Sequence, residues 1–261
     1  MRIVRFTPGP DAGLGQDPLF GVLEDDGVIS IISGDPIYSG IQKTAATIEV
    51  SKVRLLAPII PRSKVVCIGK NYADHAAEMG GVVPDEPIIF LKPNTSVIGP
   101  NDTIVWPEMS ERIDHEAELA IVIGRICKDV PKERVNDVIF GYTIANDVTA
   151  RDLQKKDGQW TRAKSFDTFC PIGPWVDTDF IPGTQKITAT IAGEVKQSAQ
   201  ISDMIFDVPT IINFVSRVMT LLPGDIILTG TPAGIGPMVA GEKATMAIEG
   251  LGELTNKLSA R

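Results

Sequence analysis

Short apolar runs separated by turn-forming residues recur along most of the chain. They have the length of β-strands and do not alternate regularly with helical segments, as the strands of a βαβ sheet would. Near the start, Asp25-Asp26-Gly27 separates two such runs and predicts a hairpin. The predicted strands are residues 3–6, 19–24, 28–32, 65–68, 88–91, 119–123, 142–145, 187–191 and 225–228.

One segment instead has the 3.6-residue periodicity of an amphipathic helix. Asp207 is placed to cap its start, and Pro223-Gly224 is expected to end it. Because strands far outnumber helices, the predicted fold class is α+β, mostly β. The apolar stripe of the predicted helix consists of Ile211, Val215, Val218 and Leu222.

A proline-containing connector at residues 55–61 divides the chain into two predicted parts. Each proline disfavours a helical conformation for the residue before it, so the connector is expected to be extended. Residues 1–58 are predicted to form a small N-terminal β-rich domain, and residues 59–261 a larger domain. Residues 33–51, between the predicted strand 28–32 and the connector, show only a weak hydrophobic pattern. A prolyl connector inside a single domain is the alternative.

Charge and cysteine content argue against several classes of protein. A net charge of -8 and a pI near 4.9 argue against nucleic-acid and membrane partners, because both attract basic surfaces. The three cysteines, Cys67, Cys127 and Cys170, form no CxxC pair, so neither a disulfide framework nor a cysteine zinc site is indicated. Cys67 and Cys127 are expected to pack in the core. With no signal-peptide pattern and no apolar run near ~20 residues, a cytoplasmic location is expected.

Three acidic residues stand at the ends of apolar runs. If the run that begins near Ala117 is a strand, Glu116 and Glu118 point to the same face, about 7 Å apart along the strand. A hard cation such as Mg²⁺, Mn²⁺ or Ca²⁺ would relieve their repulsion, and Asp147 would complete a set of three carboxylates. The alternatives are a solvated acidic strand end and, for Asp147, a helix cap or turn residue. His115-Glu116 does not begin an HExxH zinc motif, because Leu119 occupies the second histidine position.

His75 and Glu78 lie three residues apart in a predicted short helix that glycines end. A carboxylate beside an imidazole selects its tautomer and raises its basicity, as activation of water by a general base requires. The flanking Gly69, Gly80 and Gly81 favour a segment that moves as a lid. A surface histidine with an incidental glutamate neighbour is the alternative.

Two further segments contain candidate site residues that their local sequence supports only weakly. Lys164 has no local feature that separates it from a solvated lysine. The run at residues 228–237 is rich in glycine, but it has neither a P-loop lysine nor Rossmann spacing. It is interpreted as a tight loop that offers backbone N–H groups, including that of Gly230, and the Thr231 hydroxyl to a small carboxylate.

Taken together, these segments closely resemble the fumarylacetoacetate hydrolase family over about residues 60–256. The resemblance rests on several independent motifs that occur in the family order and spacing. They are Cys67-Ile68-Gly69-Lys70-Asn71-Tyr72-Ala73-Asp74-His75 through Glu78, Phe90-Leu91-Lys92-Pro93, Glu116-Ala117-Glu118-Leu119, Asn146-Asp147-Val148-Thr149-Ala150-Arg151-Asp152, Ala163-Lys164-Ser165 and Thr229-Gly230-Thr231-Pro232-Ala233-Gly234.

The resemblance implies a mixed β-roll catalytic domain, a homodimer and a site that holds Mg²⁺ or Mn²⁺ through Glu116, Glu118 and Asp147. It implies that His75 and Glu78 form a water-activating dyad on a lid. It also implies that Lys164 and the Gly230-Thr231 loop face the substrate, and that Arg151 and Gln154 border its pocket. The length resembles that of the short acylpyruvase and oxaloacetate decarboxylase branch.

The expected function is metal-dependent hydrolysis of the C–C bond of an acylpyruvate-type 2,4-dioxo acid, such as fumarylpyruvate or acetylpyruvate, through a metal-stabilised pyruvate enolate. Oxaloacetate decarboxylation and isomerisation of 2-hydroxyhepta-2,4-diene-1,7-dioate would use the same electron sink and are the alternatives. Two readings from other classes rank lower. One is a non-catalytic metal-binding protein with a structural Ca²⁺ site, and the other is a metal-free hydrolase with Glu116 and Glu118 as paired carboxylates.

Overall fold

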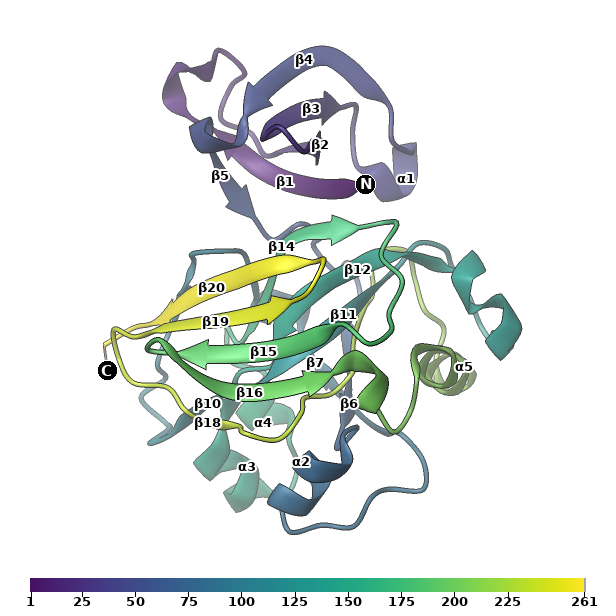
Figure 1. Ribbon diagram of the computed structural model, residues 1–261, viewed down its shortest axis with the longest axis vertical. Helices are drawn as coiled ribbons and strands as arrows, with labels where there is room; N and C mark the ends of the chain where they lie inside the picture. Colours follow the sequence, from purple (N-terminus) through teal and green to yellow (C-terminus); the bar gives the residue numbers. More distant parts are fainter. Residues whose placement is uncertain (261) are drawn as a thin grey trace.

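Strands dominate the architecture, as the short apolar runs predict. The computed structural model describes residues 1–260, and within them it has twenty β-strands and five α-helices. The predicted α+β, mostly β class is therefore confirmed. Figure 1 shows three parts, a small lobe at the top, a body of mixed sheets below it, and helices at the bottom and right.

The lobe contains the first five strands and the short helix α1 (Figure 1). The predicted hairpin is confirmed, because β2 and β3 pair in antiparallel fashion. The weakly patterned segment contains α1 and β4. The lobe is joined to the body by β1, which pairs with β14 through Ile3 and Val176, so one sheet continues across the predicted domain boundary. The bounds are β1 Arg2–Pro8, β2 Leu19–Leu23, β3 Val28–Ile32, α1 Pro36–Ser39, β4 Lys43–Glu49 and β5 Val53–Leu56.

The central sheet of the body continues in the order β14-β12-β11-β17-β6-β7. All seven residues of β11 are buried, because the strand is paired on both edges and covered on both faces. The only parallel neighbours along this part of the path are β17 and β6. The bounds are β6 Val65–Gly69, β7 Ile88–Lys92, β8 Val97–Ile98, β11 Ala117–Ile123, β12 Ile139–Asn146, β14 Cys170–Asp177 and β17 Ile226–Leu228.

A second sheet of five strands, in the order β16-β15-β19-β20-β9, lies in front of β11 and β12 in Figure 1. Leu119 and Ile144 of the central sheet pack with Ile187 and Met246 of this second sheet in the largest apolar cluster. A third, three-stranded sheet has the order β13-β10-β18. The bounds are β9 Thr103–Ile104, β10 Ile113–His115, β13 Thr149–Ala150, β15 Lys186–Ile191, β16 Glu194–Gln200, β18 Gly236–Pro237, β19 Lys243–Ile248 and β20 Gly252–Leu258.

The opposite face of the central sheet buries a separate apolar cluster, and Cys67 and Cys170 belong to it. The prediction that Cys67 packs in the core is confirmed. Cys127 is only half-buried, at the edge of the larger cluster.

Helices α2, α3 and α4 lie together at the bottom of Figure 1, and α5 lies apart from them on the right. Asp207 caps α5, since its side chain accepts a hydrogen bond from the Thr210 N–H. No helix in residues 1–260 is long and apolar enough to cross a membrane. The bounds are α2 Ala73–Glu78, α3 Arg151–Asp157, α4 Thr161–Lys164 and α5 Val208–Val218.

The predicted end of α5 is wrong. The helix stops at Val218, before Leu222 and before the expected Pro223-Gly224 stop, and Val218 itself is 56% exposed. The chain becomes extended at Met219, and Leu221 then exchanges two backbone hydrogen bonds with Cys127. This pairing buries Leu221 completely and takes the place of another helical turn.

Candidate functional site

Three carboxylates meet where β11 and β12 run side by side. Glu116 immediately precedes β11, Glu118 lies on it, and Asp147 immediately follows β12. Because β11 and β12 pair with Ala117 opposite Asn146, and the Asp147 N–H donates to the Glu116 carbonyl, the three residues come into register. One ligand atom from each lies within 4.8 Å of the others, and the three residues are at most 4% exposed. Their burial excludes a solvated strand end. Asp147 does not cap a helix, since Ala150 occupies the N-cap position of α3.

The three carboxylates differ in their neighbours. Burial opposes ionisation of Glu116, but the cations Lys164 and Arg151 outweigh it and hold the pKa of that carboxyl well below its usual range. Glu118 has the opposite balance, because burial, then Asp147 and Glu116, raise the pKa of its carboxyl well above the usual value. Within residues 1–260, the Glu118 carboxylate accepts its hydrogen bond from the Gly230 N–H and not from a cation.

This donor set fits a hard divalent cation. Three buried carboxylates are the oxygen ligands that Mg²⁺ and Mn²⁺ prefer. An ionised Glu118 beside two other carboxylates is costly unless a positive charge joins it, and a dication would supply that charge. Glu116, Glu118 and Asp147 are therefore the residues that would hold the ion.

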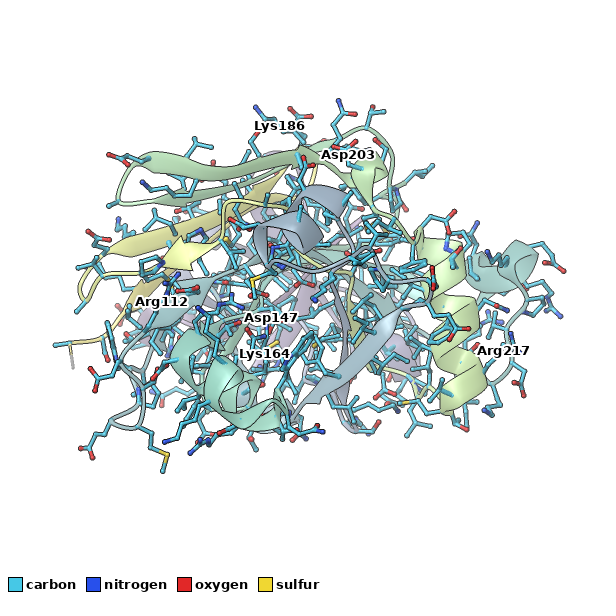
Figure 2. All side chains as sticks on the ribbon, turned by 90° about the horizontal axis from the view of Figure 1, so that it is seen from below. Arg112, Asp147, Lys164, Lys186, Asp203 and Arg217 are labelled. Carbon is cyan, nitrogen blue, oxygen red and sulfur yellow. The ribbon has the colours of Figure 1, made fainter. Side chains whose placement is uncertain are left out.

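Lysine side chains reach the same carboxylates from two directions. Lys164 is 2% exposed, and its Nζ donates to Glu116 Oε2 over 2.8 Å and to Asp147 Oδ2 over 2.6 Å. Figure 2 shows Lys164 and Asp147 beside each other in the interior. The reading of Lys164 as a solvated lysine is thus excluded. Lys92, which ends β7, donates to the other oxygen of Asp147 over 2.6 Å and is 1% exposed.

Arg151 begins α3 and is buried among polar partners. Its Nε donates to Asp114 over 2.9 Å, one terminal nitrogen donates to Gln154 over 2.6 Å, and the other donates to Glu116. Asp114 also accepts two hydrogen bonds from Arg112. The guanidinium therefore holds Glu116 and Gln154 in place while it lines the pocket.

The predicted pair on α2 is formed. His75 Nδ1 lies 3.2 Å from Glu78 Oε2, and the histidine is 6% exposed, so it is not a surface residue. Glu78 is held in turn by the Gly234 N–H, at 3.1 and 3.3 Å from its two oxygens. With Nδ1–H directed at Glu78, Nε2 carries the lone pair that can accept a proton.

The glycine-rich loop after β17 forms hydrogen bonds with the strand that carries Glu118. The Gly230 N–H donates to Glu118 Oε2 over 2.6 Å, and the Thr231 hydroxyl donates to the Ala117 carbonyl over 2.9 Å and accepts from Gln197. Gly230 has φ 97°, and an added Cβ would lie 2.6 Å from Cβ of Asn71, so a glycine is required there. In this conformation both groups bind protein atoms, and their expected role toward a substrate stays a prediction.

A pocket opens over the carboxylates. Eight predicted site residues line it, whereas Glu78 and Gly230 lie behind His75 and Glu118. The predicted site residues in the lining are His75, Glu116, Glu118, Asp147, Arg151, Gln154, Lys164 and Thr231, and the lining residues that were not predicted as site residues are Ile68, Gly69, Lys70, Met79, Phe90 and Trp160.

Phe90 and Trp160 form an aromatic wall of this pocket. Their ring centroids are 5.2 Å apart in an edge-to-face arrangement, and the Lys164 ammonium lies 5.1 Å from the Phe90 centroid. Gly69 admits the indole, because an added Cβ would lie 2.6 Å from a ring carbon of Trp160. An aromatic residue near the end of a strand-length apolar run was the available signal for Phe90, whereas nothing local distinguishes Trp160.

The fold and site define a mostly β protein with a buried three-carboxylate centre suited to a divalent cation. Comparison with known protein families gives the same fold and family as the sequence motifs predict. Residues 64–259 match the family model described as fumarylacetoacetate (FAA) hydrolase, C-terminal, and residues 1–58 match one described as Rv2993c-like, N-terminal. The chain belongs to the fumarylacetoacetate hydrolase family, as its sequence motifs predict.

Curated relatives share much of the chain. Protein Rv2993c of Mycobacterium tuberculosis is 55% identical over 226 residues, which cover 85% of this chain and 83% of the relative. The mitochondrial oxaloacetate tautomerase Fahd2a of Rattus norvegicus is 43% identical over 219 residues, which cover 80% and 70%.

Solved structures match along nearly the whole length. A structure described as 5-carboxymethyl-2-hydroxymuconate delta-isomerase from Mycobacterium smegmatis has a TM-score of 0.91 and 46% identity, and covers 100% of both chains. Maleylpyruvate hydrolase from Sphingobium sp. SYK-6, solved with manganese(II) and pyruvate, has a TM-score of 0.80 and 32% identity, and covers 99% of both chains.

Proposed function

We propose that this protein is a divalent-metal-dependent enzyme that hydrolyses the C–C bond of a short acylpyruvate-type 2,4-dioxo acid. The observation that carries the proposal is the convergence of Glu116, Glu118 and Asp147 in one pocket with the His75–Glu78 pair. The carboxylates suit Mg²⁺ or Mn²⁺, and the maleylpyruvate hydrolase relative was solved with manganese(II) and pyruvate. When bound, the cation supplies Lewis-acid polarisation of the substrate 2-oxo group.

The residues of the dyad perform the proton transfers. Glu78 accepts the His75 Nδ1–H, which leaves Nε2 to remove a proton from a water molecule in the pocket. The resulting hydroxide attacks the C4 carbonyl, and the C3–C4 bond breaks with its electron pair passing to C3. C4 leaves as a carboxylic acid, and the proton held by His75 returns to C3, which yields pyruvate.

The buried cations of the pocket hold its carboxylates in place. Lys164 bridges Glu116 and Asp147, and Arg151 orients Glu116 and Gln154. The apolar wall of Phe90 and Trp160 excludes water from one side of the site. Charge that develops on the substrate oxygens is therefore met by groups that are already oriented.

A second candidate is keto–enol tautomerisation or double-bond isomerisation of a 2-oxo acid. It is favoured by the relatives named oxaloacetate tautomerase, at 43% identity, and 5-carboxymethyl-2-hydroxymuconate delta-isomerase, at 46%. His75 would then move a proton between carbon positions of the substrate, and no water would be consumed.

Parallel assays of the purified protein separate the candidates. Fumarylpyruvate, acetylpyruvate, oxaloacetate and 2-hydroxyhepta-2,4-diene-1,7-dioate are supplied with Mg²⁺, with Mn²⁺, and after exhaustive chelation. Metal-dependent release of pyruvate from an acylpyruvate supports hydrolysis. Interconversion of enol and keto forms without pyruvate release supports the second candidate. Binding of metal without any reaction contradicts both, and full activity after chelation contradicts the metal-dependent mechanism.

A further inference from the structure

Lys70 is a pocket residue whose charge is not used by the site described so far. It lies in the turn between β6 and α2, is half-buried and lines the pocket over the carboxylates. Its φ of 56° falls in the left-handed region, which residues other than glycine rarely adopt. Such a conformation persists where the surroundings enforce it, and it is concentrated at functional sites.

Asn71 enforces this conformation. Its Nδ2 donates to the carbonyls of Phe206 and Thr229 over 3.0 and 2.7 Å, and its Oδ1 accepts from the Phe206 N–H over 2.7 Å. Its own carbonyl accepts from the Ile205 N–H. Asn71 is completely buried, so these hydrogen bonds hold the backbone of the turn that carries Lys70.

The other cations of the pocket already have carboxylate partners. Arg151 is paired with Asp114 and Glu116, and Lys164 with Glu116 and Asp147. For Lys70, by contrast, the part of the chain that the structure describes contains no hydrogen-bond or ion-pair partner. Because every other pocket-lining cation is neutralised by the protein, a half-buried Lys70 ammonium is available to an anionic group of the ligand.

The backbone opposite Lys70 leaves room for its ammonium. A Cβ added at Gly81 would lie 2.6 Å from Lys70 Nζ, so the ammonium rests against Gly81, just beyond α2. Met79 and His75, which also line the pocket, belong to the same segment. Lys70 thus lies at the α2 side of the pocket, and the carboxylate cluster belongs to the ends of β11 and β12.

We propose that Lys70 binds the second carboxylate of a dicarboxylic 2-oxo acid, at the end of the substrate remote from Glu116, Glu118 and Asp147. The inference rests on the proposed function, in which the first carboxylate and the 2-oxo group occupy the metal site. A single ammonium suits a monoanionic carboxylate, for which it provides one charge-assisted hydrogen bond. The preferred substrates are therefore of the fumarylpyruvate type, with two carboxylates, rather than the acetylpyruvate type, with one.

The kinetic test compares Lys70→Gln and Lys70→Arg with the wild type, all loaded with Mg²⁺. Loss of one charge-assisted hydrogen bond raises KM for fumarylpyruvate by about tenfold or more in Lys70→Gln. KM for acetylpyruvate stays unchanged, and Lys70→Arg keeps the preference. Lys243→Gln, an exposed position on β19, is the matched control. An equal change for both substrates, or no change for either, overturns the inference.

A binding test separates this inference from the proposed reaction. Calorimetry measures the affinity of the Mg²⁺-loaded protein for 2-oxoglutarate and for 2-oxovalerate, which differ by the distal carboxylate. The wild type binds 2-oxoglutarate more tightly, and Lys70→Gln removes the difference. If the wild type turned over none of the 2-oxo acids, the proposed function would fail, and calorimetry alone would decide the role of Lys70. Equal wild-type affinities for the two acids overturn that role.

Discussion

The Lys164 ammonium donates to Asp147 Oδ2 over 2.6 Å, and the two side chains are only 3% and 1% exposed. A carboxylate proposed to hold a metal ion is thus already paired with a cation of the chain. Burial opposes the charge of Lys164, but Asp147 and Glu116 outweigh burial and raise the pKa of its ammonium, so the lysine is charged at neutral pH. Lys164 in turn favours the ionised form of Glu116, whose pKa is held well below its usual range.

Replacement of this lysine tests that balance. In the metal-free protein, Lys164→Met leaves Glu116 and Asp147 with less compensation and is expected to cost about 3–5 kcal/mol of stability, as for other broken buried ion pairs. The thermal unfolding midpoint should fall by roughly 10 °C for a chain of this size. Mg²⁺ should raise the midpoint of the variant more than that of the wild type, because the ion replaces the missing charge.

Lys186→Met provides the control for this measurement, because Lys186 is exposed on β15 (Figure 2). Its unfolding midpoint should match that of the wild type. A Lys164→Met variant that unfolds at the wild-type temperature without metal would contradict the role assigned to the lysine.

Glu118 should behave in the opposite way. Its carboxyl group is buried beside Asp147 and Glu116, so Glu118→Gln removes a group whose ionised form they repel, while it keeps the shape of the side chain. We expect the stability of the metal-free protein to be unchanged or higher, and Mg²⁺ and Mn²⁺ affinity to fall by roughly 100-fold, since one of three charged ligands is lost. Calorimetric titration measures the affinity. Glu253→Gln, an exposed position on β20, should bind metal like the wild type.

Metal affinity should also depend on pH through Glu118. Its pKa is raised in the folded protein from a usual value of 4.5, so the folded state holds a proton that the unfolded state has released. Stability of the metal-free protein should therefore fall as the pH rises from 4.5 through the raised pKa. Metal binding requires the ionised carboxylate, so affinity should rise over the same interval and a proton should be released.

Calorimetry in two buffers with different ionisation enthalpies measures this release. The wild type should release a proton that Glu118→Gln does not. The same proton count for both proteins would assign the release to another group.

Much of the carboxylate cluster could be predicted from local sequence. The two-residue period of a strand places Glu116 and Glu118 on one face, whatever the rest of the chain does. Asp147 was a local candidate because it follows an apolar run, and His75 and Glu78 because of their three-residue spacing; the family order then favoured these candidates over their alternatives. The pairing of Lys92 with Asp147 could not be predicted locally, since it joins residues 55 apart, at the ends of β7 and β12, which are not neighbours in the central sheet. A lysine that ends an apolar run was the available signal.

The end of α5 shows a second limit. The periodicity extends to Leu222, but the structure ends the helix at Val218 because Leu221 pairs with Cys127, almost a hundred residues earlier. A distant partner on another segment thus outweighs a local helical pattern. The backbone conformation of Lys70 has the same kind of cause, since its left-handed turn depends on the contacts of Asn71 with Phe206 and Thr229.

The His75–Glu78 pair offers the sharpest test of the proposed reaction. His75→Ala removes the base that accepts the water proton, and general-base catalysis typically contributes about 10²–10⁴-fold. We expect kcat for an acylpyruvate to fall by that range while Mg²⁺ affinity stays unchanged, because His75 is not among the three carboxylates of the metal site. Glu78→Gln keeps a side chain that can accept the Gly234 N–H but loses its charge, so a smaller fall in kcat is expected.

Asp74→Asn on the same helix is the matched control, because it removes an exposed negative charge without touching the pair. Its kcat should equal that of the wild type. If His75→Ala hydrolysed an acylpyruvate at the wild-type rate, His75 would not be the base. If only interconversion of enol and keto forms depended on His75, the proton would be moved between carbon positions, as in the tautomerase and isomerase relatives. The hydrolytic assignment would then give way to the second candidate, although the metal site and its lysines would be unaffected.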